Sequence, residues 1–179
     1  MTTEKDCNMY KEKMIDCMET KRLVLFPYTK ENLSLFNQDL PSFEKLYDVK
    51  YQGEELDYLL KNFLVKLEKE ISSDVDNYLF FTEFLIVLKE TSQIIGSIDY
   101  KYFPIDGLTE VGYGLNPKFE GNGYMTEALT KFLEFGKSLG IKKVRADTLK
   151  DNIKSQNVLK KCGFSFLEEK DNLWWEKEL

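Results

Sequence analysis

Apolar residues change their spacing along this chain, and the changes divide it into predicted helices and strands. Between residues 54 and 71, Leu, Phe and Ile recur at intervals of three and four, which predicts an amphipathic helix. The apolar run over 22–27 predicts a first strand. A short helix over 29–37 is predicted to follow it, with Thr29 as its N-cap. The first part of the chain therefore favours one strand followed by helices.

From residue 78 onward the spacing becomes that of strands. Segments 78–89, 94–103 and 108–115 are rich in apolar and aromatic residues and are separated by short turns, so they predict an antiparallel meander. The later predicted elements are a helix beginning near Met125, a strand over 143–149, a helix over 152–161 ended by Gly163, and strands over 164–168 and 173–177. We expect a single domain over 21–179 after an N-terminal extension over 1–20.

Length and charge narrow the class of protein. A chain of 179 residues is of the size expected for one domain. No stretch approaches the roughly 20 apolar residues of a membrane span, and the N-terminus is too polar for a signal peptide. We therefore expect a cytoplasmic protein without a membrane partner. The net charge is −6, with lysines and acids interspersed, which argues against nucleic acid as a partner.

The sequence contains no histidine. A Ser-His-Asp triad, a Cys-His pair and every histidine-containing zinc site are therefore excluded, and no calcium-loop spacing is present. No metal is expected, although carboxylates alone could still form a metal site, and a general base must be Glu, Asp, Lys, Tyr, Cys or water. The three cysteines, Cys7, Cys17 and Cys162, are odd in number and lack CxxC spacing, which predicts free thiols.

A glycine-rich segment over 116–127 lies between a predicted strand and a predicted helix. Gly121 and Gly123 permit a tight turn, and the following helix offers unpaired N–H groups and a positive dipole end. Such a turn is suited to a pyrophosphate. It lacks the Lys and Ser/Thr of a Walker loop and does not match GxGxxG, so neither a nucleotide triphosphate nor a dinucleotide is indicated. Taken alone, the segment is equally typical of an ordinary turn capping a helix.

Four segments in order resemble the GNAT acyltransferase superfamily, within it the RimJ/RimL-like branch that acetylates protein N-termini and similar amines. They are Glu19–Tyr28, Glu110–Pro117, Gly121–Ala128 and Asp151–Phe164, and the resemblance extends to Leu179. The resemblance implies an α/β (α+β) fold. Its mixed, mostly antiparallel central sheet would have about seven strands, flanked by helices and splayed where acetyl-CoA binds.

The same resemblance implies direct transfer of an acetyl group from acetyl-CoA to an amine, either a small molecule or a protein N-terminus, and is compatible with a homodimer. The residues it implies for acetyl-CoA binding are Tyr113, Gly114, Leu115, Gly121, Asn122, Gly123, Tyr124, Met125, Thr126 and Asn152. Glu120 departs from the family, which prefers Gln or Arg there, and Met125 stands where Gly or Ala is usual. We therefore assign the loop's role to its backbone N–H groups.

Glu110 is the candidate general base, acting directly or through water, because it matches a position where many family members carry an acid. Strict alternation places Glu110, Gly112 and Gly114 on one strand face, which would leave room for a substrate beside the carboxylate. A solvated strand glutamate paired with a lysine is the alternative. An α-amine, with a pKa near ~8, needs much less help from a base than a lysine amine, near ~10.4.

Ser155 is the candidate that protonates the departing thiolate, as the RimJ/RimL-like branch implies. Many superfamily members use a tyrosine that corresponds to Leu159 in this chain. Ser155 lies one helical turn after Asn152, so the two can face one ligand. A solvated helix serine is the alternative, and Tyr113 is a second possible donor.

Two other functions stay open at this point. A non-catalytic acyl-CoA-binding module would bind CoA but release no thiol from acetyl-CoA when amines are supplied. A nucleotide-binding protein without acyl chemistry would respond to ADP as strongly as to acetyl-CoA. The sequence does not identify the amine acceptor.

Overall fold

The computed structural model describes residues 17–52, 58–74 and 76–179, of which 58–61 are described in their backbone only. The strands are β1 Met18–Glu19, β2 Leu23–Pro27, β3 Lys50–Tyr51, β4 Glu83–Leu88, β5 Gln93–Tyr100, β6 Leu108–Leu115, β7 Lys143–Thr148, β8 Ser165–Glu169 and β9 Leu173–Glu178. The helices are α2 Lys30–Gln38, α3 Leu40–Tyr47, α4 Tyr58–Ser73, α5 Tyr124–Ser138 and α6 Ile153–Lys161, with short 3₁₀ turns η1 Tyr78–Phe80 and η2 Pro117–Phe119.

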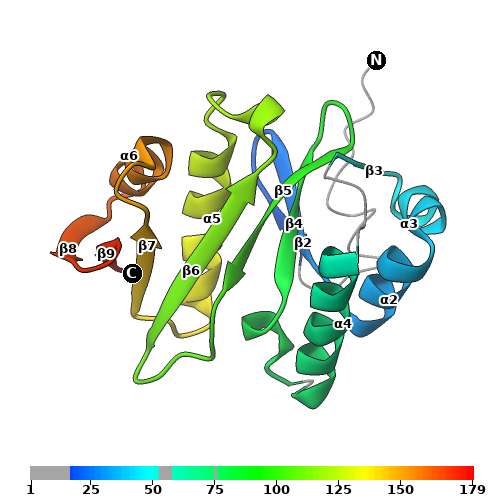
Figure 1. The fold of residues 1–179 in the computed structure, drawn as a ribbon, viewed down its shortest axis with the longest axis horizontal. Helices are drawn as coiled ribbons and strands as arrows, with labels where there is room; N and C mark the ends of the chain where they lie inside the picture. Colours follow the sequence, from blue (N-terminus) through cyan, green and yellow to red (C-terminus); the bar gives the residue numbers. More distant parts are fainter. Residues whose placement is uncertain (1–16, 53–57, 75) are drawn as a thin grey trace.

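The strands form one mixed sheet in the order β1-β2-β4-β5-β6-β7-β9-β8, with the short strand β3 paired to β5 (Figure 1). Only the β6–β7 and β3–β5 pairs are parallel in the described part of the chain. Seven of the described strands have five residues or more, and β1 and β3 have two each. The predicted fold class, a mostly antiparallel mixed sheet of about seven strands flanked by helices, is confirmed.

The sheet opens between its two central strands. β6 pairs with β5 over Val111–Leu115, but it pairs with β7 only over Leu108–Glu110. Beyond Glu110 the two strands therefore separate, and the outer half of β6 has a free edge on its β7 side. The predicted splay is confirmed, and it lies next to the glycine-rich loop that follows β6.

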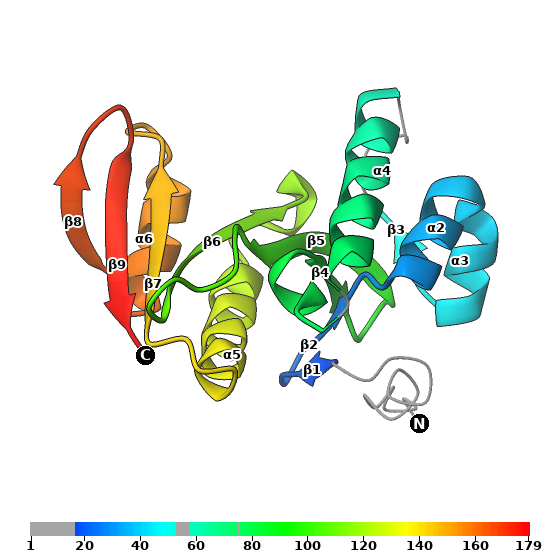
Figure 2. The same cartoon turned by 90° about the horizontal axis from the view of Figure 1, so that it is seen from below.

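Helices cover both faces of the sheet, as Figure 2 shows for α5 on one side and α4 on the other. Successive strand residues point to opposite faces. Phe84 and Ile98 are accordingly buried with the apolar side of α5, whereas Leu85 and Val87 are buried with α2, α3 and α4. The sheet therefore separates two hydrophobic cores, one on the α5 side and one on the side of α2, α3 and α4.

Several local predictions are confirmed. Thr29 caps α2 with a full capping box, in which it and Asn32 each bond the other's backbone N–H. In the long predicted helix, Leu64, Leu67 and Ile71 are buried. Residues 54–57 of that prediction lie outside the described residues.

Other predictions need correction. The strand predicted over 78–89 begins at Glu83, because Tyr78–Phe80 form a 3₁₀ turn and Phe80 packs against Tyr100. The sequence reading also missed α3, which has Pro41 in its first turn. Met18 and Glu19, within the predicted N-terminal extension, form β1 and pair with β2.

Cysteine chemistry differs in part from the expectation of free thiols. Cys162 is a free, buried thiol, but Cys17 takes part in a disulfide, so the expectation is wrong at that position. No helix of the described residues is both long and apolar enough to cross a membrane. Those residues also contain no group of three or more Cys, Asp or Glu arranged to hold a metal ion.

Candidate functional site

The glycine-rich loop leads from β6 into α5 through two residues of left-handed backbone. Gly121 has φ 79° and Gly123 has φ 77°, a region that favours glycine because it has no Cβ. Gly123 is the N-cap of α5, and no side chain bonds the first N–H groups of this helix within the described residues. The end of α5 therefore presents open N–H donors and a positive dipole, which suit an anion.

A cavity of about 390 Å³ lies between the outer half of β6, this loop and α6. It is lined by every predicted acetyl-CoA-binding residue except Asn122, namely Tyr113, Gly114, Leu115, Gly121, Gly123, Tyr124, Met125, Thr126 and Asn152, and also by Ser155. The Asn122 side chain instead donates hydrogen bonds to the carbonyl oxygens of Phe119 and Glu120, at 3.2 and 3.1 Å. Asn122 thus closes the loop rather than facing the cavity.

Two lysines of α6 add positive charge to this cavity, and the sequence reading missed both. Lys154 forms an ion pair with Glu120, and Lys161 lines the cavity further along the helix. The ion pair explains how a glutamate can stand next to an anion site, because Lys154 compensates its charge. The signal in the sequence was the spacing of lysines along 153–161, which also fits a solvated helix face.

A cluster of hydrogen bonds fixes the loop to the edge of the sheet. Glu127 in the first turn of α5 accepts from the Thr20 hydroxyl at 2.6 Å, the Arg22 backbone N–H at 2.8 Å and the Arg22 Nε at 2.7 Å. Arg22 also donates through Nη1 to the carbonyl oxygen of Asn122 at 3.0 Å and lies over the Tyr124 ring. Burial acts to raise the pKa of Glu127, but these hydrogen bonds lower it overall.

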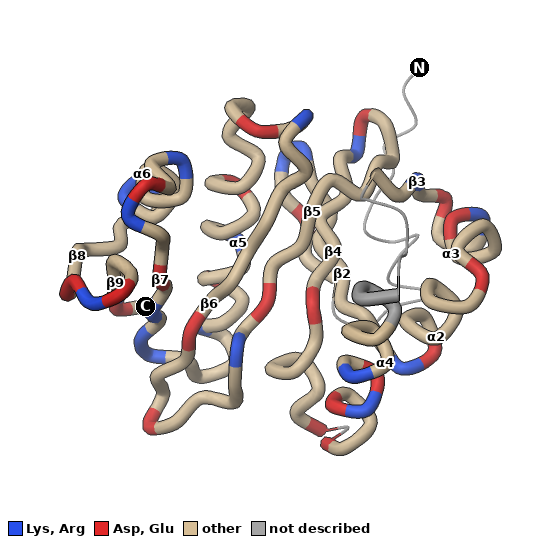
Figure 3. The backbone as a smooth tube through the Cα atoms, in the orientation of Figure 1, with Lys and Arg blue, Asp and Glu red and all other residues tan. Residues whose placement is uncertain are grey.

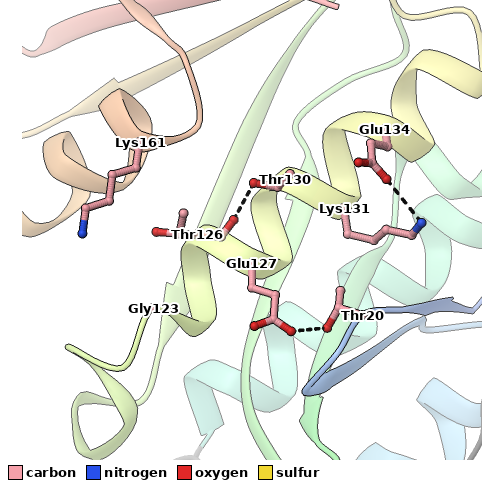
Figure 4. Close-up of a pocket in the computed structure, with 8 residues that line it drawn as sticks. All are labelled: Thr20, Gly123, Thr126, Glu127, Thr130, Lys131, Glu134 and Lys161. Atoms are coloured by element: carbon pink, nitrogen blue, oxygen red, sulfur yellow. Dashed lines mark hydrogen bonds and ion pairs between the residues drawn. The ribbon is translucent and has the colours of Figure 1, made fainter.

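Figure 4 shows the outer side of this cluster, a depression of about 480 Å³ along α5. Three of its polar side chains have partners within the fold: Glu127 binds Thr20, Lys131 pairs with Glu134 at 3.3 Å, and Thr130 donates to a carbonyl of its own helix. It shares Gly123, Thr126 and Lys161 with the cavity described above. We therefore regard it as the outer wall of the loop.

Replacing Arg22 by methionine is expected to raise the Kd for CoA about tenfold. The variant loses charge-assisted hydrogen bonds that hold Asn122 and the start of α5, each worth roughly 1.5–3 kcal/mol, so part of the loop's order must be regained on binding. Isothermal titration calorimetry measures the Kd. Lys131→Met, which removes a neighbouring exposed ion pair, is the control and should leave the Kd for CoA unchanged. Equal effects in the two variants would contradict the role of Arg22 in holding the loop.

Tyr113 and Ser155 meet across the cavity. The Tyr113 hydroxyl lies 2.9 Å from Ser155 Oγ, and the Asn152 side chain accepts from the Ser155 backbone N–H at 3.1 Å. Burial raises the pKa of Tyr113 to about 12. Leu159, one helical turn after Ser155, is fully buried. The structure thus brings Asn152, Ser155 and Tyr113 together at the N-terminal end of α6.

The surroundings of Glu110 differ from the expectation. The regular pairing of β6 with β5 keeps Glu110, Gly112 and Gly114 on one face, as predicted. However, a Cβ at Gly112 would overlap the ammonium group of Lys101. The end of the Lys101 side chain therefore occupies the space beside Gly112 that was expected to be open to a substrate. Burial, and then the charge of Asp147, raise the pKa of Glu110. Its side chain lines neither of the two cavities described here.

Gly114, by contrast, faces open space, and a Cβ there would meet nothing within 4 Å. This space belongs to a second cavity of about 390 Å³ on the α4 side of the sheet. Its walls are mostly aromatic and aliphatic, and its polar residues include Glu83 and Ser97. The two cavities share Gly114 and Leu115, so they meet across β6 at a residue without a side chain.

Glu83 is a candidate site residue that the sequence analysis did not identify. It is the first residue of β4, its side chain is partly accessible through the second cavity, and burial followed by the charge of Asp99 raises its pKa to about 7. The signal in the sequence was a lone acid within the apolar run 78–89. A strand assignment alone does not say which face such a residue occupies.

Comparison with known proteins agrees with this geometry. The family model described as an acetyltransferase (GNAT) domain matches residues 22–165. Among curated proteins, the uncharacterized N-acetyltransferase YnaD of Bacillus subtilis (strain 168) is 33% identical over 103 residues, 53% of this chain and 60% of that protein. The chain spans about half the length of the curated relatives it matches.

Solved structures resemble the chain over nearly its whole length. A ribosomal-protein-S5-alanine acetyltransferase from Vibrio fischeri has a TM-score of 0.63 at 20% identity, over 91% of this chain and 96% of that one. RimL, a ribosomal L7/L12 α-N-protein acetyltransferase solved with coenzyme A, has a TM-score of 0.63 at 15% identity, over 92% and 98%. At these identities the likeness concerns the fold alone. Together with the family match over most of its length, the splayed sheet and the glycine-rich loop establish that the chain belongs to the GNAT acetyltransferase family.

Proposed function

We propose that this protein transfers an acetyl group from acetyl-CoA to a primary amine. The observation that carries the proposal is the meeting of two cavities at Gly114. One has the features of a CoA site, and the other opens on the opposite face of the sheet. A thioester bound on one side can therefore meet an amine bound on the other.

The donor half of the proposal is supported by the loop, the lysines and the free edge of β6. The open N–H groups of α5 are suited to the CoA pyrophosphate, with Lys154 and Lys161 beside it. The unpaired edge of Val111–Leu115 offers backbone groups to the pantetheine arm, and Asn152 stands at the end of α6 next to it. RimL, which shares the fold, has been solved with CoA.

In the proposed reaction the amine nitrogen attacks the thioester carbon, the N–C bond forms, the C–S bond breaks, and CoA leaves as a thiolate. Tyr113 and Ser155 supply the thiolate's proton, since their hydroxyl groups form one hydrogen-bonded pair in the CoA cavity. Glu110 lies about 13 Å along the strand from Gly114, four residues at ~3.3 Å each. For an amine at Gly114, Glu110 would act as base through water.

The acceptor in this proposal is a primary amine on a small molecule or a protein N-terminus. A cytoplasmic location and a homodimer remain predictions from the sequence.

Acetyl-CoA at 100 times its Kd is expected to stabilise the protein by about 2.7 kcal/mol, which raises the melting temperature by roughly 5–10 °C. ADP should shift it much less, because it lacks the pantetheine arm. With an amine panel, acetyl-CoA should release free thiol above the rate without amine, as a thiol reagent reports. An equal shift by ADP, or no amine-dependent thiol, would contradict the proposed function.

A further inference from the structure

The second cavity contains an acid whose carboxylate forms no ion pair with the described part of the chain. Glu83 on β4 is the direct register partner of Asp99 on β5, so two carboxylates face each other across the strands. Figure 3 shows acidic positions on the neighbouring strands β4, β5 and β6. Like charges directly opposite in a sheet repel unless a cation or a proton lies between them.

The nearest cation is committed to one of the two acids. Lys101 binds Asp99, with its Nζ 2.9 Å from one carboxylate oxygen and 3.1 Å from the other. No hydrogen bond or ion pair to the Glu83 carboxylate occurs among the described residues. Glu83 also lines the cavity, whereas Asp99 does not. A cationic ligand entering the cavity would therefore find Glu83 available and Asp99 already paired.

The rest of the cavity is suited to an apolar group. Its walls include the rings of Tyr28, Phe36, Tyr51 and Phe63, together with Leu64, Leu85, Ile94 and Ile95. Phe63 on α4 lines the cavity and is 45% exposed, so its ring is accessible to a ligand there.

We infer that this cavity selects a primary amine carried on an apolar or aromatic group, and that Glu83 binds its ammonium and removes a proton before acetyl transfer. The inference rests on the proposed function, because it names the acceptor of the same reaction. Polycations, sugars and polar amines are disfavoured, since their polar groups would be buried against aromatic and aliphatic walls without partners.

The proton balance favours Glu83 over an ordinary carboxylate. The ammonium gives one proton to the Glu83 carboxylate, and the neutral amine attacks the thioester carbon. As the tetrahedral adduct collapses and the C–S bond breaks, the second proton passes from the nitrogen to the departing thiolate through the Tyr113–Ser155 pair, and Glu83 later releases its proton to solvent. For a primary amine with a pKa near ~10.4, proton transfer to a carboxylate with a pKa of about 7 has an equilibrium constant of roughly 10⁻³. For an unperturbed glutamate the equilibrium constant is about 10⁻⁶.

The test compares 2-phenylethylamine, ethanolamine and spermidine as acceptors, using thiol release from acetyl-CoA. We expect kcat/KM for 2-phenylethylamine to exceed those for the other two at least tenfold, since burial of a phenyl group contributes about that factor or more. Glu83→Gln should lower kcat/KM for 2-phenylethylamine about 50-fold and leave the Kd for acetyl-CoA within about twofold. Glu90→Gln, the same chemical change in the exposed turn after β4, is the matched control and should act like the wild type.

Phe63→Ala keeps the test informative if Glu83→Gln folds poorly, because it should remove the preference for 2-phenylethylamine while ethanolamine turnover persists. Thiol release that favours ethanolamine or spermidine, or full activity in Glu83→Gln, would overturn the inference and leave the acetyltransferase intact. Acetyl-CoA binding without thiol release from any amine would overturn both. A loss of kcat/KM in Glu110→Gln with none in Glu83→Gln would show that Glu110, and not Glu83, accepts the proton of the amine.

Discussion

Replacing Gly114 by valine is expected to lower kcat/KM for acetyl transfer at least 100-fold while the Kd for acetyl-CoA stays within about threefold. Gly114 is the point where the two cavities meet, and its missing side chain would point to the α4 side, as do its neighbours Gly112 and Glu110. The three carbons of the isopropyl group would lie between the amine and the thioester. A displacement of about 1 Å from the reactive geometry is enough to cost a factor of 100.

The same geometry predicts that the variant folds. A Cβ at Gly114 would meet nothing within 4 Å, and its backbone is that of an ordinary strand, where β-branched residues are favoured. The neighbouring position Gly96 behaves in the opposite way, because a Cβ there would overlap the carbonyl oxygen of Gly114. We therefore expect the free energy of unfolding of Gly114→Val to lie within about 1 kcal/mol of the wild type.

Calorimetry with acetyl-CoA and the rate of thiol release separate the two effects. Gly114→Ala is the graded control and should lose less activity than Gly114→Val, because it adds one methyl group. If both variants keep wild-type rates, acetyl transfer does not pass across β6 at this residue. A parallel loss of acetyl-CoA binding would instead mean that Gly114 acts on the donor side.

The elements of this fold follow largely from local pattern. β6, with its Pro/Gly turn before it and Pro117 after it, is found over the predicted residues, and the Thr29 cap fixes the start of α2. The predictions failed where tertiary contacts outweigh pattern. Tyr78–Phe80 have strand-like composition but turn, because Phe80 fills a position beside Tyr100 and Phe103.

The donor and acceptor halves of the candidate site also differ in how far they could be predicted from local sequence pattern. The glycine-rich loop of the donor half is contiguous in sequence, so Gly121, Gly123 and the start of α5 could be predicted from spacing and the helix terminus. The acceptor half is assembled from β4, β5, β6 and α4, and its chemistry depends on register. Whether Lys101 covers Gly112, and whether Glu83 faces the same cavity as Gly114, is set by strand pairing that one sequence does not reveal.

Removing both hydroxyl groups of the Tyr113–Ser155 pair is expected to lower kcat about 100-fold. A leaving thiolate needs a proton donor, and such donors contribute roughly 10²–10⁴-fold. The two groups are 2.9 Å apart and line the CoA cavity, so each can partly replace the other. Tyr113→Phe and Ser155→Ala alone should therefore each cost about tenfold or less, and the double variant should reveal the coupling between them.

The measurement is kcat at saturating acetyl-CoA and amine, together with the Kd for CoA, which should change little because the loop and the lysines are intact. Since burial holds the pKa of Tyr113 at about 12, the phenol stays protonated at pH 7 to 9, and the deficit of Tyr113→Phe should persist over that range. Tyr102→Phe, in the hairpin before β6 and away from the CoA cavity, is the control. Full activity in the double variant would mean that water protonates the thiolate, and the pair would then serve only to hold the start of α6 against β6.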